Sequence, residues 1–304
     1  MKIALTTGDK MVVKILIGLI VISGIAAILT SCDREDTGSI GNVRVNVQMP
    51  DSIESGKTIT FTFDGITHEA MTRATLTEAQ MTDLWVFDYV GGSLVQTIHQ
   101  VSTDEGFSTV SLTADYGDHQ LYFVASRGDT PAIDGTTISW SKPSDTFWQN
   151  VTLNVEPQTE PLQAVSLQRV ATRLRISITD EVPTGLASIA VTPSVWYYGL
   201  DYTTGEATDS RTTARTVSVP ASYVGTIGQL SASFYCISQS AAWQTNLSIT
   251  AKGSDDATMA SVDITGVPMQ RNRITTFSGR LFSASRGVSV SVDDSWDTEY
   301  TGTW

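Results

Sequence analysis

The chain has 304 residues, a formal net charge of −13 at pH 7 and only two cysteines. Its length suits one large domain or two ordinary ones, and so acidic a surface repels phosphate backbones, which argues against a nucleic-acid partner. Two cysteines are too few for a disulfide-rich scaffold.

The N-terminal region carries an export signal. Lys14 precedes an apolar run of about 15 residues at positions 15–29, which is shorter than the roughly 20 residues of a comfortable membrane span. Asp9 is unusual in such a leader, which suggests that Met11 is the true start. We therefore expect residues 1–31 to be a signal peptide rather than a membrane-spanning helix.

The leader ends in a motif that resembles a bacterial lipobox, in which the cysteine is acylated and the chain is cut before it. The motif consists of Leu29, Thr30, Ser31 and Cys32. More than one acyl chain gives stable anchoring, so residues 32–41 are predicted to be a tether that reaches the membrane through the lipid on Cys32. The alternative is an ordinary signal peptide with an incidental cysteine.

An acidic cluster follows the lipidation site at Asp33, Glu35 and Asp36, interrupted by Arg34. It resembles the signal that exports Bacteroidetes lipoproteins to the outer face. The expected location is the cell outer membrane, with the body exposed at the surface. The choice between inner and outer leaflet stays open at this stage.

Period-two alternation marks the first expected strand after the tether, at residues 43–49. Its apolar face consists of Val43, Val45, Val47 and Met49. A second strand with the same alternation follows at residues 58–63. Such a pattern is typical of a strand with one face in the core and one in solvent.

A β-hairpin is predicted next, with strands at 84–90 and 93–98 and Gly91-Gly92 as its two-residue turn. Further β-branched or aromatic runs occupy positions 108–113, 120–125, 137–140, 151–155, 170–178, 188–191, 195–198, 215–219, 229–237, 247–251, 261–264, 274–282 and 287–292. The total of about sixteen short strands is roughly twice what one β-sandwich uses.

The predicted fold class is therefore all-β, with two consecutive β-sandwich domains after the signal peptide. The polar, proline-containing stretch at 156–161 is the expected connector. This gives an N-terminal sandwich at 42–165 and a C-terminal sandwich at 166–304.

Residues suited to catalysis are scarce. His68, His99 and His119 are the only histidines, and none is at metal-ligand spacing. His99 and His119 are expected at ordinary strand edges. Nucleophile-elbow, phosphate-loop and dinucleotide motifs are missing from the sequence. We expect no enzyme activity, no cofactor and no metal, although the acidic run at 293–297 leaves calcium open beside the simpler interpretation of a solvated turn.

Cysteine and tryptophan usage also has two interpretations. Cys236 lies in an apolar run and is expected to be a buried core residue. The seven tryptophans could stack on sugars or fill cores and seal edges, and packing is the favoured interpretation. Trp85 and Trp196 are expected in the core, and three others nearer loops, namely Trp140, Trp148 and Trp243.

These features resemble the fimbrillin-like family of Bacteroidetes, whose members are the subunits and anchors of surface pili. The motifs that carry the resemblance are a strand soon after the lipidated Cys32, a Met-Thr-Arg-Ala sequence at 71–74, the run Asp-Leu-Trp-Val-Phe-Asp at 83–88 and the run Leu-Gln-Arg-Val-Ala-Thr-Arg-Leu at 167–174. They are spread over nearly the whole body.

The resemblance implies two transthyretin-like sandwiches and a trypsin-like protease that cuts between Arg73 and Ala74. The strands around Val43 and Ile59 would then leave the N-terminal domain, and a neighbouring subunit would add a strand in their place. It implies other fimbrial subunits as partners, a role in cell adhesion, and a fimbrial location once the chain is cut.

Two alternatives stay open. An uncut chain would remain lipidated, as the anchor subunits of the family do, and the position at shaft, tip or base is not determined. A surface glycan-binding lipoprotein with exposed aromatic platforms is the second hypothesis of function.

Overall fold

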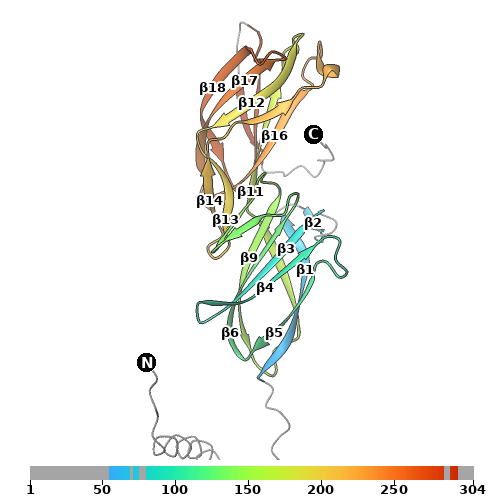
Figure 1. Cartoon of the computed structure of the whole chain (residues 1–304), viewed down its shortest axis with the longest axis vertical. Coiled ribbons are helices and arrows are strands. Elements are labelled where there is room, and N and C mark those ends of the chain that lie inside the picture. The colour runs from blue at the N-terminus through green and yellow to red at the C-terminus, as the bar shows by residue number, and fades with distance from the viewer. Residues whose placement is uncertain (1–54, 69–70, 75–79, 284–287, 294–304) are drawn as a thin grey trace, which may run out of the picture. The chain divides into compact units, whose positions relative to one another are not determined.

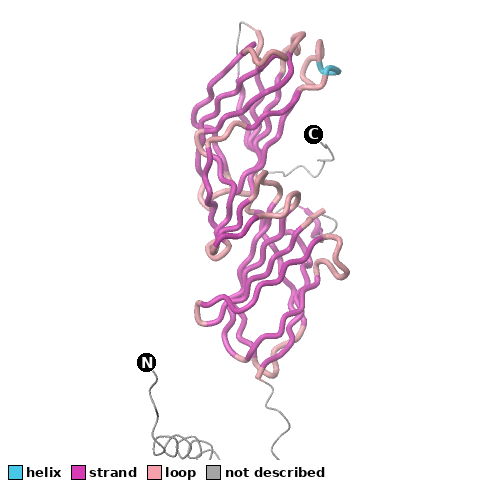
Figure 2. Tube along the Cα trace, viewed as in Figure 1, coloured by secondary structure: helices cyan, strands magenta, loops and turns pink. Residues whose placement is uncertain are grey.

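The computed structural model describes residues 55–68, 71–74, 80–283 and 288–293. These residues belong to one compact unit, residues 54–304. Figure 2 shows strands joined by loops, with one 3-10 turn in the described part, η1 (Ala221–Tyr223). Across these ranges, no helix has the length and apolar character that a membrane crossing requires.

One eight-stranded sheet builds the first half of this unit, which we call the first lobe (Figure 1). Its strands in sheet order are β2 (Met71–Ala74), β1 (Gly56–His68), β10 (Leu162–Arg169), β9 (Thr146–Val155), β6 (Gly117–Ser126), β3 (Asp83–Val90) and β4 (Ser93–Val101), with β5 (Thr109–Asp115) paired to β1. β10 meets β9 only at its last two residues. The strands on the two sides of that junction therefore pack face to face.

Two further sheets form the second lobe. The first contains β20 (Val288–Asp293), β19 (Ile274–Gly279), β11 (Ala171–Ile178), β16 (Leu230–Ile237), β13 (Trp196–Asp201), β8 (Thr137–Ser139) and β7 (Ala132–Asp134), with β14 (Glu206–Arg211) paired to β13. The second contains β15 (Arg215–Ser218), β12 (Leu186–Pro193), β17 (Trp243–Gly253) and β18 (Thr258–Met269).

Alternation along the strands explains the layers. In β5 the side chains of Val110, Leu112 and Ala114 are buried and those between them are exposed. Successive side chains of a strand point to opposite faces of the sheet. This pattern therefore gives one face exposed to solvent and one face buried in the core. Each lobe has its own hydrophobic core. The predicted all-β class with β-sandwich architecture is confirmed.

The predicted hairpin is confirmed as well. β3 and β4 pair in antiparallel register and are joined by Gly91 and Gly92. Both glycines have positive φ, 57° and 80°. A two-residue hairpin turn of this type needs positive φ at both positions, which glycine adopts without strain.

The change from one lobe to the other occurs at Val170. β10 still belongs to the first lobe and β11 opens the second, so the expected boundary at 165 falls within β10. The stretch at 156–161 joins β9 to β10 of the same sheet. Polar and proline-containing composition marks a turn, and it does not distinguish a turn within a sheet from a linker between domains.

A third cluster of buried side chains combines residues from both lobes. It contains Phe87, Val124, Ile138, Trp140, Val170, Leu200, Tyr202, Ala207 and Ile237. The short strands β7 and β8 precede β9 in the chain, yet β8 pairs with β13 of the second lobe and β7 pairs with β8. The lobes are therefore joined by packed aliphatic and aromatic side chains as well as by the chain itself.

Candidate functional site: the slot that holds strand β1

Most of the sequence-predicted site residues lie outside the described part. The lipobox at 29–32 and the predicted exchange strand at 43–49 precede residue 55, so both stay predictions. The predicted cleavage point is described at the level of the backbone. Arg73 and Ala74 belong to β2, the short strand at one edge of the first-lobe sheet.

Strand β1 is paired on both of its edges. Residues 56–62 run antiparallel to β5, and residues 60–67 run parallel to β10. The amide N–H of Thr60 also donates to the carbonyl oxygen of Pro161 at 2.7 Å. If β1 left, a slot would open with unpaired backbone donors and acceptors on both sides.

Three alternate side chains of β1 fill the core of the first lobe. Ile59 and Phe61 are 0% exposed and Phe63 is 4% exposed. The ring centroids of Phe61 and Phe63 lie 5.3 Å and 5.5 Å from that of Phe123 in β6. Full burial of one such side chain contributes about 1.5–3 kcal/mol, so β1 supplies a large part of the stability of this lobe.

The same core cluster supplies the walls of the slot. The side chains come from strands β5, β10, β3, β6 and β9. They are Val110, Leu112, Ala114, Val165, Leu167, Leu84, Val86, Leu121, Phe123, Ala125, Phe147 and Val155. The slot is therefore apolar along its floor and offers hydrogen bonds only along its two backbone edges.

The beginning of β1 makes a polar contact. The ammonium group of Lys57 donates to the carbonyl oxygens of Pro157 and Thr159, at 3.1 Å and 2.5 Å. Both carbonyls belong to the turn between β9 and β10. One residue earlier, a Cβ on Gly56 would lie 2.3 Å from the carbonyl oxygen of Ala114, so only glycine fits this close approach.

The predicted cleavage point lies in the only covalent route from β1 to β3. β2 pairs with β1 through Ile66–Ala74 and His68–Met71. A cut between Arg73 and Ala74 would leave β1 held by hydrogen bonds and packing alone. The geometry thus combines a buried interior strand with a predicted cleavage point close behind it.

His119 differs from its sequence expectation. It was expected at an ordinary strand edge, yet its side chain is 3% exposed. Its Nδ1 lies 2.8 Å from the Asp88 carboxylate and its Nε2 lies 2.9 Å from the Asp115 carbonyl oxygen. Both ring nitrogens are thus held by groups of neighbouring strands, β3 and β5, and the side chain is a structural contact of the first lobe.

The other described histidine also forms a local pair. His99 Nε2 lies 2.8 Å from the Asp83 carboxylate, and its ring stacks on Trp85 with centroids 3.7 Å apart. The side chain of His68 lies outside the described ones. Among the described residues, no cluster of three or more His, Cys, Asp or Glu side chains is arranged to hold a metal ion. Of the acidic run at 293–297, only Asp293 is described.

Five of the seven tryptophans are described, and all five pack within the chain. Trp140 and Trp196 are 1% exposed. Trp85 is not in the first-lobe core as expected; it is half-buried on the opposite face of β3, against the cluster that joins the lobes. Trp148 and Trp243 are partly buried, and their indole N–H groups donate to Tyr202 O at 2.8 Å and to Ser238 Oγ at 3.0 Å. No described tryptophan forms an open platform.

Tyr202 is the residue that sequence reasoning missed. Its ring stacks on Phe87 with centroids 3.8 Å apart, and its hydroxyl lies 2.9 Å from that of Tyr89. Burial raises the pKa of Tyr202, and its hydrogen bond to Tyr89 adds to the increase. The residue follows β13 in a turn, so no alternation pattern in the sequence marks it.

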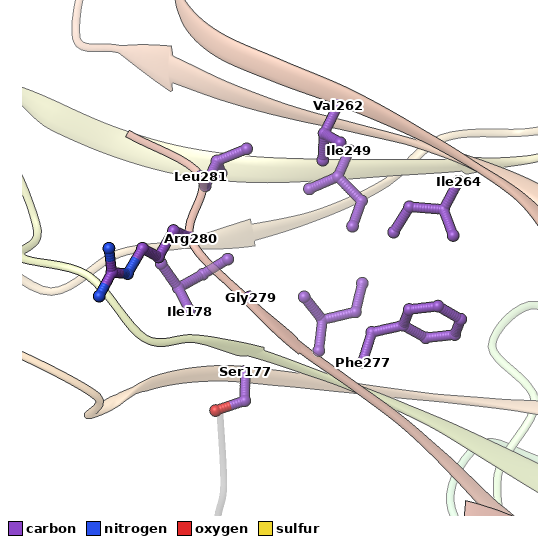
Figure 3. A pocket seen from close by; sticks show the side chains of 10 residues that line it. Ser177, Ile178, Ile249, Val262, Ile264, Phe277, Gly279, Arg280 and Leu281 are labelled. Atoms are coloured by element: carbon purple, nitrogen blue, oxygen red, sulfur yellow. The ribbon is translucent and has the colours of Figure 1, made fainter. Parts of the chain in front are cut away.

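An apolar pocket lies between the two sheets of the second lobe (Figure 3). Its volume is about 20 Å³, which is close to the space of one water molecule. Ile178, Ile249, Ile264 and Phe277 line it, while the guanidinium of Arg280 points away from them. Ligand sites are usually an order of magnitude larger, so this pocket is a packing gap.

Comparisons with solved structures identify the fold. A "putative adhesin" from Bacteroides ovatus has a TM-score of 0.51 and 13% identity, covering 78% of this chain and 94% of that one. "Putative polysaccharide binding proteins" from Bacteroides thetaiotaomicron give a TM-score of 0.52 and 12% identity, covering 79% and 98%. The fimbrial anchor protein Mfa2 from Porphyromonas gingivalis gives 0.46 and 9%, covering 79% and 98%.

At such identities the first two similarities establish a shared fold. The resemblance to the fimbrillin-like family is confirmed at that level. No curated protein gives a sequence match.

A family profile also matches the sequence directly. Its description is "Family of unknown function (DUF6562)", and the match spans residues 132–304. It begins at β7, the first strand in chain order of the second lobe, and includes β9 and β10 of the first. Because the match covers more than half of the sequence, this chain belongs to the DUF6562 family of unknown function.

Proposed function

We propose that this chain is a non-enzymatic cell-surface lipoprotein that serves as a structural, anchor or accessory subunit of an adhesive fimbria. One observation carries the proposal: β1 is a buried strand paired on both edges, and Arg73–Ala74 lies in its only covalent link to β3.

Cleavage between Arg73 and Ala74 by a trypsin-like protease would release the segment that carries β1. The emptied slot would then present apolar pockets between two unpaired strand edges, which is a template for strand addition. A strand from a neighbouring subunit would fill it. Because the donor and acceptor surfaces differ, successive additions join head to tail and give an open filament.

The uncut chain has a related role in this proposal. Lipid on Cys32 would hold the intact protein at the outer membrane, exposed at the surface, where it would act as an anchor. Cleavage would also remove that lipid, so one event would both free the subunit and open its slot. The fold shared with proteins described as adhesins supports a role in adhesion.

Glycan binding is the weaker candidate. A Bacteroides thetaiotaomicron protein of the same fold is described as polysaccharide binding, which keeps the idea testable. Against it, the five described tryptophans are engaged in packing rather than exposed in a row. Tryptophan fluorescence that shifts on titration with a polysaccharide panel would favour this second function.

The deciding experiment is to determine the N-terminus of the protein from cell envelopes by mass spectrometry, with and without a trypsin-like protease. A lipid-free species that begins at Ala74 is the expected result for an assembling subunit. An acylated Cys32 on an intact chain that resists the protease would exclude strand exchange and leave the anchor role or the glycan-binding role, which a sugar titration would then separate. A different new N-terminus would contradict the predicted cleavage point.

A further inference from the structure

The slot around β1 has side-chain pockets of defined size and a defined charge at one end. These features limit which strands can fill it. We infer that the slot selects a partner strand of the pattern basic-x-aliphatic-x-aromatic-x-aromatic, and that this strand is not the C-terminal stretch 288–304 of the chain itself. The inference rests on the proposed function, because it concerns the slot that cleavage would empty.

The aromatic positions follow from packing. Phe61 and Phe63 are nearly fully buried and both contact the ring of Phe123. Interiors are close-packed, so a smaller side chain at either position would leave a cavity that the sheet cannot close. The position of Ile59, also fully buried, requires a branched or straight aliphatic side chain.

The basic position follows from the contact of Lys57. Its ammonium group satisfies the carbonyl oxygens of Pro157 and Thr159. The turn that holds these carbonyls also contains Glu156 and Glu160, so this end of the slot favours positive charge. A carboxylate at the same place would be repelled, because the two carbonyl oxygens and the glutamates of the turn are all negative.

The side chains on the opposite face of β1 are small and polar. Thr58 is exposed, and the hydroxyl of Thr60 lies 2.8 Å from that of Ser111 in β5. The direction is also set, since the strand must run antiparallel to β5 and parallel to β10 to keep both ladders. Small hydroxyl residues therefore fit the intervening positions, while the buried positions and the direction of the strand carry the selection.

The C-terminal stretch of the chain does not match this pattern. Its alternate positions are occupied by Val288, Val290, Val292, Asp294, Trp296, Thr298, Tyr300, Gly302 and Trp304. The only three successive large apolar side chains are the three valines, which are too small for the pockets of Phe61 and Phe63. Every later window of three contains Asp, Thr or Gly. The stretch also has four acidic residues and no lysine or arginine.

A peptide-exchange experiment tests the inference. The intact chain is cut by a trypsin-like protease, the protease is inhibited, and a fluorescent peptide of residues 55–68 is added. Incorporation is followed by polarisation and size-exclusion chromatography. The Arg73→Ala chain, treated in the same way, is the matched control that should stay uncut and exclude the peptide.

Unlabelled peptides then compete for the slot. The 55–68 peptide should displace the label, while the same peptide with Phe61→Val and Phe63→Val should compete about a hundredfold more weakly. The Lys57→Glu peptide should be about tenfold weaker. The 288–304 peptide should not compete.

Two results would overturn the inference, and they are distinguishable. If the 288–304 peptide or the double-valine peptide competes within about threefold of the 55–68 peptide, the slot accepts strands but does not select them. If the 55–68 peptide itself never enters the cut chain, the slot is not a strand acceptor, and the proposed function fails together with the inference.

Discussion

The phenol ring of Tyr202 lies flat against the ring of Phe87, with centroids 3.8 Å apart and planes inclined by 2°. Phe87 belongs to β3 of the first lobe, and Tyr202 follows β13 of the second. Both residues belong to the buried cluster that joins the lobes. The contact is also held by hydrogen bonds, because the carbonyl oxygen of Tyr202 accepts the indole N–H of Trp148 at 2.8 Å.

Tyr202→Ala is expected to destabilise the protein by about 3–5 kcal/mol, as truncation of a buried aromatic residue usually does. Tyr202→Phe keeps the stack and loses the hydroxyl contacts to Tyr89 and Gly135, so it should cost about 1 kcal/mol. Denaturant unfolding of both variants measures the difference. Equal stability of the two variants would show that the stack contributes little.

Phe61→Ala should destabilise the first lobe by about 3–5 kcal/mol, because it empties the pocket next to Phe123. Thr58→Ala on the exposed face of the same strand is the matched control and should stay within about 0.5 kcal/mol. Hydrogen–deuterium exchange followed by peptide mass spectrometry would show which strands lose stability. A similar effect of both substitutions would mean that β1 is not the core strand described above.

Cys236 should be inert in the folded protein. The thiol is 0% exposed, and burial raises the pKa of Cys236, so very little of the reactive thiolate forms near neutral pH. We expect no alkylation by iodoacetamide at pH 8 without denaturant and complete alkylation after unfolding. Rapid labelling of the native chain, detected by mass spectrometry, would contradict this environment.

Asp180 should make stability depend on pH in the acid range. Burial alone would raise the pKa of Asp180, but the backbone N–H groups of Leu281, Phe282 and Ser283 donate to its carboxylate and together lower the pKa. The ionised form is therefore favoured by folding. Its contribution is complete above the unfolded pKa of about 3.9 and is lost as the pH falls through the lower folded value.

Asp180→Asn is expected to cost about 1–3 kcal/mol at neutral pH, because an amide replaces one of the two acceptor oxygens. The difference between the variant and the natural chain should shrink as the pH is lowered below about 4. Unfolding curves recorded across that range provide the measurement. A constant difference from pH 7 to pH 2 would rule out the carboxylate as its source.

Local pattern in the sequence determined much of this fold. The hairpin of β3 and β4 is visible as two alternating runs around Gly91 and Gly92, and its geometry depends only on neighbours in the chain. Burial of Cys236 follows from its apolar run. The all-β class follows from many short runs of period two, since each run records which of its faces meets a core.

Only the tertiary structure decided the pairing of distant segments. Alternation shows that Ile59 and Phe61 share a face, but not that β10, about a hundred residues later, lies parallel beside them. The same limit explains Tyr202 and His119, whose partners come from other strands. The physical reason is that an alternating pattern shows whether each side chain is buried or exposed. It carries no information about which other strand buries it.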